Sequence, residues 1–126
     1  MEPKFKAWVL FGPTTKFGEG RAHLLELIDR HGSIKHAVDE IGMSYRTAWG
    51  YIRELEAAAG FHLMERTPGR GEHGGTRLTP AGRKFLDRYW SFHDGIERSV
   101  TQQFARAFGK RNAAPAKKKK PSARRG

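Results

Sequence analysis

The chain has 126 residues, no cysteine and a formal net charge of +11 at neutral pH. This length suffices for one small domain and a tail, and the lack of cysteine excludes a disulfide framework and a thiolate metal site. The longest apolar run, residues 7–11, is far shorter than the ~20 residues that span a membrane, and the N-terminus lacks the apolar segment of a secretory signal, so we expect a cytoplasmic protein without a membrane partner.

The first third of the chain predicts a short strand and a helix. Residues 5–11 are β-prone and end at Gly12-Pro13, a turn signal, so a strand is expected there and a loop over residues 14–18. A helix is expected over residues 19–31, with an apolar stripe that Gly32 ends. The stripe consists of Leu24, Leu25, Leu27 and Ile28.

Residues 33–60 predict a helix-turn-helix. Ser33 and Ser44 are suited to cap the starts of two helices, because a serine hydroxyl accepts a hydrogen bond from an exposed backbone N–H. Between them, Gly42 permits the left-handed turn that ends the first helix, and Gly60 closes the second. In this arrangement the second helix lies in the DNA major groove.

The second of these helices has two distinct faces. At 100° per residue, Ala48, Ile52, Leu55 and Ala59 share one side and are expected to pack on the domain. The candidate DNA-binding residues near this helix are Ser33, Ser44, Tyr45, Arg46, Thr47, Gly50 and Arg53. An arginine can bind guanine through two hydrogen bonds, and a glycine lets the backbone approach closely. The alternative is a solvated helix face.

Trp49 falls between these two faces. We interpret it as a packing residue that fixes the helix against its neighbours, in preference to a base contact.

Residues 62–79 predict a hairpin of the wing type. Two short strands, 62–66 and 76–79, flank residues 67–75, which include four glycines. Arg70 and Arg77 are candidates to reach phosphates or the neighbouring minor groove. The alternatives are a mobile hairpin with scattered charge, and a nucleotide phosphate loop, which the missing Gly-Lys-Ser/Thr ending excludes.

The last helix is expected over residues 80–108, because Thr79-Pro80 is a strong helix start. It would be roughly 40 Å long, so its far half needs another surface. A second copy of the chain is the simplest source, and packing within the chain is the alternative. The candidate dimerisation residues recur every three or four positions: Phe85, Tyr89, Phe92, Ile96, Val100 and Phe104.

Residues 109–126 predict a disordered basic tail. They hold 8 basic and no acidic residues, whereas residues 1–108 hold 16 basic and 13 acidic ones. A polyanion, most often nucleic acid, is the natural partner, and a solubilising end is the alternative. The tail has no aromatic residue for stacking, so Lys117, Lys118, Lys119 and Lys120 would contact phosphates without regard to sequence.

The fold class expected is therefore mainly α with a small β-hairpin wing: a winged helix-turn-helix with a long C-terminal dimerisation helix. One domain over residues 1–108 and the tail make up the chain. The six histidines are scattered without metal-ligand spacing or a nucleophile–base pattern, so we expect no enzyme, no metal and no cofactor.

With these residues in view, the chain resembles the DNA-binding domain of ModE-type molybdate-responsive regulators, over about residues 5–100. The most specific matches are Gly32-Ser33-Ile34 and Ser44-Tyr45-Arg46 with Ala48-Trp49. The spacing of Leu55-Glu56, Gly60 and Leu78 to Gly82 is also similar to LysR-type winged helices. The resemblance implies a dimeric transcription regulator that binds palindromic operators.

Full-length ModE-type members carry C-terminal molybdate-binding domains, and we expect this chain to lack its own. The expected function is a sequence-specific transcriptional regulator that binds double-stranded DNA as a homodimer through helix-turn-helix and wing. The alternative is a nucleoid-associated architectural protein of low specificity. A signal received through a separate sensor protein is a further alternative.

Removing residues 110–126 should weaken binding to all DNA sequences and flatten its salt dependence, because fewer counterions are released, while the preferred site stays preferred. Titrations of full-length and shortened protein at several salt concentrations measure this. An unchanged salt slope would contradict the role given to the tail.

Overall fold

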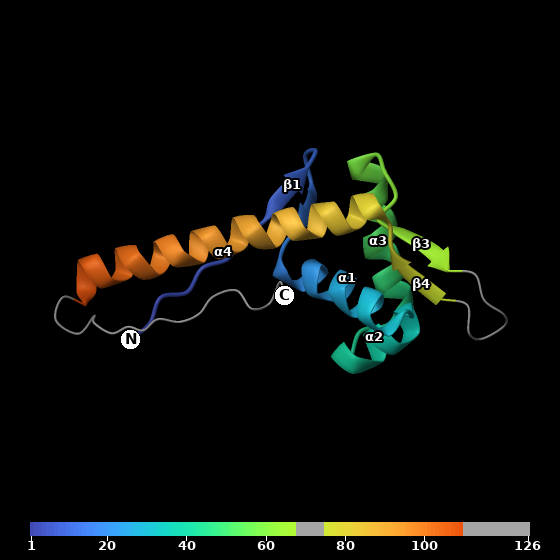
Figure 1. The fold of residues 1–126 in the computed structure, drawn as a ribbon, viewed down its shortest axis with the longest axis horizontal. Helices are drawn as coiled ribbons and strands as arrows, with labels where there is room; N and C mark the ends of the chain where they lie inside the picture. Colours follow the sequence, from blue (N-terminus) through green and yellow to red (C-terminus); the bar gives the residue numbers. More distant parts are fainter. Residues whose placement is uncertain (68–74, 110–126) are drawn as a thin grey trace. The chain divides into compact units, whose positions relative to one another are not determined.

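The computed structural model describes residues 1–67 and 75–109. The elements in chain order are β1 (Val9–Phe11), β2 (Thr15–Phe17), α1 (Glu19–His31), α2 (Ile34–Ile41), α3 (Tyr45–Ala59), β3 (Met64–Thr67), β4 (Gly75–Leu78) and α4 (Pro80–Phe108) (Figure 1). The expected fold class, helices with a small β-hairpin wing and a long C-terminal helix, is confirmed.

The chain divides into two compact units. One is Trp8–Leu86, and the other joins Met1–Ala7 to the chain from Asp87 onward. Helix α4 begins in the first unit and continues in the second. The expectation that residues 1–108 form a single domain stays a prediction. In the described residues, no helix combines the length and apolar character needed to cross a bilayer.

The N-terminal strand prediction was partly wrong. The strand over residues 5–11 shortens to β1, and the loop expected over residues 14–18 contains β2, which pairs antiparallel with β1. Gly12 has a φ of 68°, a left-handed conformation that lets the chain reverse. Thr15 and Phe17 of β2 then face inward while Lys16 is exposed, which is the alternation of a half-buried strand.

The core of the Trp8–Leu86 unit is formed by the buried faces of α1, α2 and α3 together with residues of the hairpins. Apolar side chains at helical spacing supply it, as expected for amphipathic helices. The largest fully buried ones in this unit are Phe17, Leu24, Leu25, Ile28, Ile52, Leu55, Leu63 and Leu86. Phe85 also belongs to this unit, because its ring lies 5.2 Å from that of Phe11 and 4.7 Å from that of Phe17.

Two carboxylates hold the wing hairpin against the helices. Asp29 of α1 accepts hydrogen bonds from the backbone N–H of Leu78 at 2.9 Å and from the Arg83 guanidinium at 2.7 Å. Glu56 of α3 accepts from the backbone N–H groups of Leu63 and Met64 at 2.7 and 3.1 Å. The first strand of the wing is thereby joined to α3 and the second to α1.

The wing strands lie within two residues of their predicted bounds. Strands β3 and β4 pair antiparallel, with Glu65 opposite Arg77 and Thr67 opposite Gly75. The backbone N–H of Thr76 donates to the carbonyl of Gly32 at 3.0 Å, and a Cβ at Gly75 would collide with that same carbonyl oxygen. Glycine at position 75 therefore permits the wing to approach the turn between α1 and α2.

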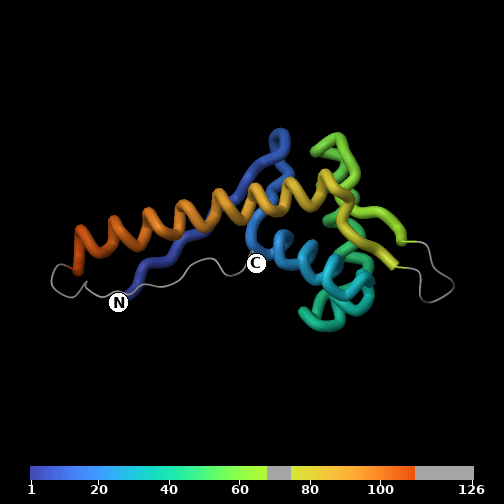
Figure 2. The backbone as a smooth tube through the Cα atoms, in the orientation of Figure 1, coloured from blue at the N-terminus to red at the C-terminus, as the bar shows by residue number. Residues whose placement is uncertain are grey.

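In the second unit, the N-terminal segment runs beside α4 (Figure 2). The Tyr89 hydroxyl donates to the carbonyl of Ala7 at 2.8 Å, and the rings of Phe5 and His93 lie 5.0 Å apart. Tyr89 is 2% exposed, so this part of the stripe on α4 packs within its own chain.

Replacing Gly82 with alanine should destabilise the fold by about 1–3 kcal/mol, because overpacking costs that much. A Cβ at position 82 would collide with the carbonyl oxygen of Leu63, a backbone atom that cannot rotate away. Urea denaturation measures the effect.

The matched control is Gly50→Ala on α3, where a Cβ meets no atom within 4 Å. Because alanine favours a helix interior by about 0.5–1 kcal/mol over glycine, this variant should be slightly more stable. A Gly82→Ala protein as stable as the parent would contradict the close packing at α4.

Candidate nucleic-acid interface

The turn between α2 and α3 is fixed by backbone geometry and side-chain caps. Gly42 adopts a left-handed conformation with a φ of 76°, and its N–H donates to the carbonyl of Val38 at 2.8 Å. The Ser44 hydroxyl then accepts from the backbone N–H of Thr47 at 3.0 Å and donates to the Thr47 hydroxyl at 2.8 Å. Both the direction and the first turn of α3 are thus determined locally.

Ser33 has the same role at α2, where its hydroxyl accepts from the backbone N–H of His36 at 3.1 Å. The two candidate serines are therefore helix caps in this structure. A cap leaves the neighbouring backbone N–H groups at the helix start directed outward, which suits an anionic partner.

Helix α3 buries one face and exposes the other. Ala48, Ile52 and Leu55 are at most 1% exposed, so this side packs on the domain. The candidate residues on the other side are all exposed: Tyr45, Arg46, Thr47, Gly50 and Arg53. The structure therefore brings these five together on one open face, in the N-terminal half of the helix.

Trp49 connects this face to the packed side. Its side chain is half-buried, its ring meets that of Tyr45 edge-on at 6.5 Å, and the Arg53 guanidinium lies 5.8 Å from its centre. Tyr45, Trp49 and Arg53 are spaced four residues apart, so they form a ladder along one side of α3. Such contacts restrict the rotamers of the two outer side chains.

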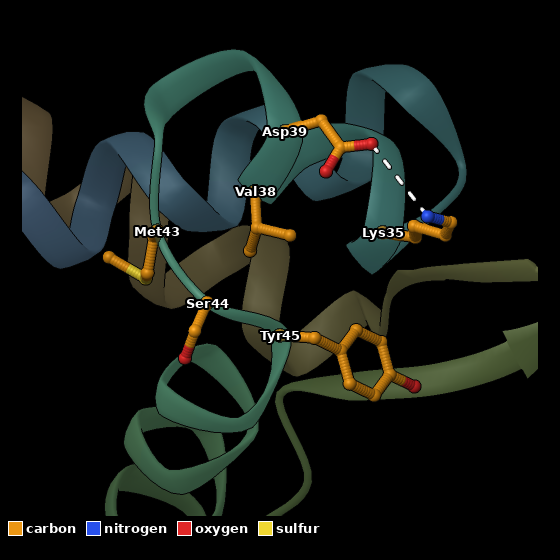
Figure 3. Close-up of a pocket in the computed structure, with 6 residues that line it drawn as sticks. All are labelled: Lys35, Val38, Asp39, Met43, Ser44 and Tyr45. Carbon is orange, nitrogen blue, oxygen red and sulfur yellow. Dashed lines mark ion pairs between the residues drawn. The ribbon is translucent and has the colours of Figure 1, made fainter.

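An open hollow of about 520 Å³ lies at the start of α3 (Figure 3). Val38 and Met43 give it apolar walls, while Lys35 and Asp39 form an ion pair of 3.9 Å at its edge. Sequence reasoning missed Lys35 and Asp39, although their spacing of four is a signal that places both on the same exposed side of α2.

On the wing, Arg77 is exposed and pairs with Glu65 across the strands at 2.9 Å. Arg66, which was not a candidate, is exposed on β3. Arg70 and the lysines 117–120 lie outside the described residues.

The candidate dimerisation residues on α4 divide into two groups. Phe85 and Tyr89 pack against their own chain, as described above. Phe92 is 46% exposed, and Ile96, Val100 and Phe104 are half-buried. The interpretation of packing within the chain thus holds for the first two positions of the stripe.

A helix-turn-helix with a wing and an exposed basic face on its second helix defines the DNA-binding regulator class. The family model described as bacterial regulatory helix-turn-helix protein, lysR family, matches residues 21–83. The chain belongs to this family.

Relatives and a solved structure agree. One relative is the molybdenum-pterin-binding protein MopB of Rhodobacter capsulatus, to which the chain is 34% identical over 86 residues. The alignment covers 68% of this chain and 32% of MopB. Another is the DNA-binding transcriptional dual regulator ModE of Escherichia coli strain K12, to which the chain is 35% identical over 69 residues. This alignment covers 55% of this chain and 26% of ModE. The DNA-binding domain of CbnR, solved in complex with DNA, superposes with a TM-score of 0.56 at 25% identity, covering 70% of this chain and 95% of that one.

The chain therefore is a ModE-like, LysR-type DNA-binding regulator domain, and the predicted resemblance is confirmed. It spans between about a quarter and a third of the length of these two curated relatives.

Proposed function

We propose that the chain binds a specific double-stranded DNA sequence by placing the N-terminal half of α3 in the major groove. The exposed face of Tyr45, Arg46, Thr47, Gly50 and Arg53 supports this most directly, because it combines donors with a backbone that can approach base edges. Arg46 and Arg53 are seven residues apart, two helical turns, so they would address successive parts of one half-site.

The wing would contact the DNA flanking this groove. Arg77 lies across from Glu65, so its guanidinium would exchange that carboxylate for a phosphate on binding. Arg66 on β3 adds an exposed positive charge to the same hairpin, and Arg70, outside the described residues, stays a candidate from the sequence. These contacts would position the protein, while α3 selects the sequence.

We further propose that two copies associate through α4, with Phe92, Ile96, Val100 and Phe104 facing the second chain. A phenylalanine that is 46% exposed beside three half-buried apolar side chains is typical of an unfilled interface. A twofold dimer would place the two α3 helices on half-sites about 34 Å apart. Chromosomal DNA as partner puts the protein at the nucleoid, in the cytoplasm.

Replacing Arg46 with alanine should remove the preference for the selected site while general affinity falls little. A wrong base opposite an arginine that makes two hydrogen bonds costs about 1–3 kcal/mol, so discrimination should drop by a factor between about 5 and about 160. Selection of bound fragments from a genomic pool, followed by titration of the best fragment and a scrambled one, measures this.

Arg88→Ala on α4 is the matched control, because it removes the same exposed charge away from α3 and should leave discrimination unchanged. If the parent protein binds the selected and scrambled fragments equally, it coats DNA without specificity and the proposal fails.

Replacing Val100 with glutamate should convert the dimer to a monomer and shorten the protected DNA from two half-sites to one, because a charge in an apolar interface is left without a partner. Light scattering after size exclusion and footprinting measure both effects. Gln102→Glu introduces the same charge on the opposite side of α4 and should change neither. A monomeric parent protein would refute the proposed dimer.

A further inference from the structure

One turn of α4 brings together a histidine and two carboxylates that the DNA interface does not use. His93, Asp94 and Glu97 each offer a nitrogen or oxygen atom, and these atoms lie within 4.8 Å of one another. At 100° per residue, positions 93, 94 and 97 span about 100° of the helix circumference, so all three side chains leave it on the same side.

Two of the three groups are buried. His93 is 3% and Asp94 7% exposed, while Glu97 is exposed. The His93 Nδ1 and Asp94 Oδ1 atoms are 3.2 Å apart. Aromatic rings surround the histidine: that of Phe5 lies at 5.0 Å and that of Trp90 at 5.2 Å. Charges in such surroundings interact strongly with any ion placed beside them.

Among the described residues, none donates a hydrogen bond to the second carboxylate oxygen of Asp94. This Oδ2 atom is inaccessible to solvent. Within residues 1–67 and 75–109, no lysine or arginine forms an ion pair with Asp94, whose side chain is 9% exposed. A buried carboxylate oxygen without a donor is costly, so its retention points to a cation that binds there.

We propose that His93, Asp94 and Glu97 bind a divalent transition-metal ion, of which Zn²⁺ fits best. Zn²⁺ bonds to histidine nitrogen and carboxylate oxygen at about 2.0–2.2 Å, which puts two tetrahedral ligands about 3.3 Å apart. The 3.2 Å between His93 Nδ1 and Asp94 Oδ1 matches that edge. Glu97 supplies the third ligand when its exposed side chain rotates toward the ion. The fourth coordination position faces solvent.

The choice of metal follows from the ligand set. Mg²⁺ and Ca²⁺ prefer six or more oxygen ligands, whereas an imidazole with two carboxylates suits Zn²⁺ and its neighbours. The ion neutralises both carboxylates and gives Asp94 its missing partner. Because Phe5 packs on His93, the metal also stabilises the N-terminal segment against α4.

The test is titration of the full chain with Zn²⁺ against a chromogenic chelator. The parent protein should bind one ion per chain at this site. Glu97→Gln should weaken binding about tenfold and Asp94→Asn about a hundredfold, since each removes a charged ligand. Because Glu97 is exposed, Glu97→Gln should keep the parent's far-ultraviolet spectrum and metal-free melting temperature. Asparagine fills the same volume as aspartate, so Asp94→Asn should keep the parent's far-ultraviolet spectrum.

Glu40→Gln is the matched control. Glu40 pairs with His31 at 2.7 Å on the surface, so it represents an ordinary histidine–carboxylate pair outside the cluster. It should leave Zn²⁺ affinity unchanged. Zn²⁺ binding that Glu97→Gln and Asp94→Asn leave intact, or that Glu40→Gln weakens equally, would overturn the proposal and assign binding to surface histidines.

Discussion

The spacing between the wing and the second helix of the helix-turn-helix depends on two carboxylates. Asp29 of α1 accepts a hydrogen bond from a backbone N–H of β4, and Glu56 of α3 accepts one from a backbone N–H just before β3. Each strand of the wing is therefore hydrogen-bonded to a different helix. Charge-assisted hydrogen bonds of this kind are short and directional, and they add to the burial of Leu63, Met64 and Leu78 at the base of the hairpin.

The position of the wing and the orientation of α3 together set the geometry of the proposed DNA-binding surface. Helix α3 is oriented by the left-handed turn at Gly42 and the Ser44 cap, and Ile52 and Leu55 lock its inner side in the core. The outer side can then be polar and exposed at no cost to the fold. A helix aligned in a groove and a hairpin beside it discriminate between sequences only if neither moves relative to the other, because binding would otherwise have to order them.

Features set by neighbouring residues were predictable from the sequence. The caps, the glycine turns and the two faces of α3 follow from local chemistry, and the structure places them as expected. Strand β2 was missed because three residues carry little periodicity and pair only once the chain reverses at Gly12. Phe85 and Tyr89 share the spacing of the exposed stripe, so the pattern could not tell packing within the chain from packing on a second copy. The cluster of His93, Asp94 and Glu97 was not predicted, because the sequence analysis considered only the spacing between histidines and not the carboxylates next to each of them.

The central claim is that the exposed face of α3 lies in the major groove at a preferred site. The chain contains no cysteine, so Gly50→Cys creates a single attachment point for an iron chelate that cleaves nearby DNA. The account predicts strand cuts inside the selected site, in two clusters about one helical turn apart, on a dimer. Protein that still binds this DNA but cuts only outside the site, or not at all, would contradict it.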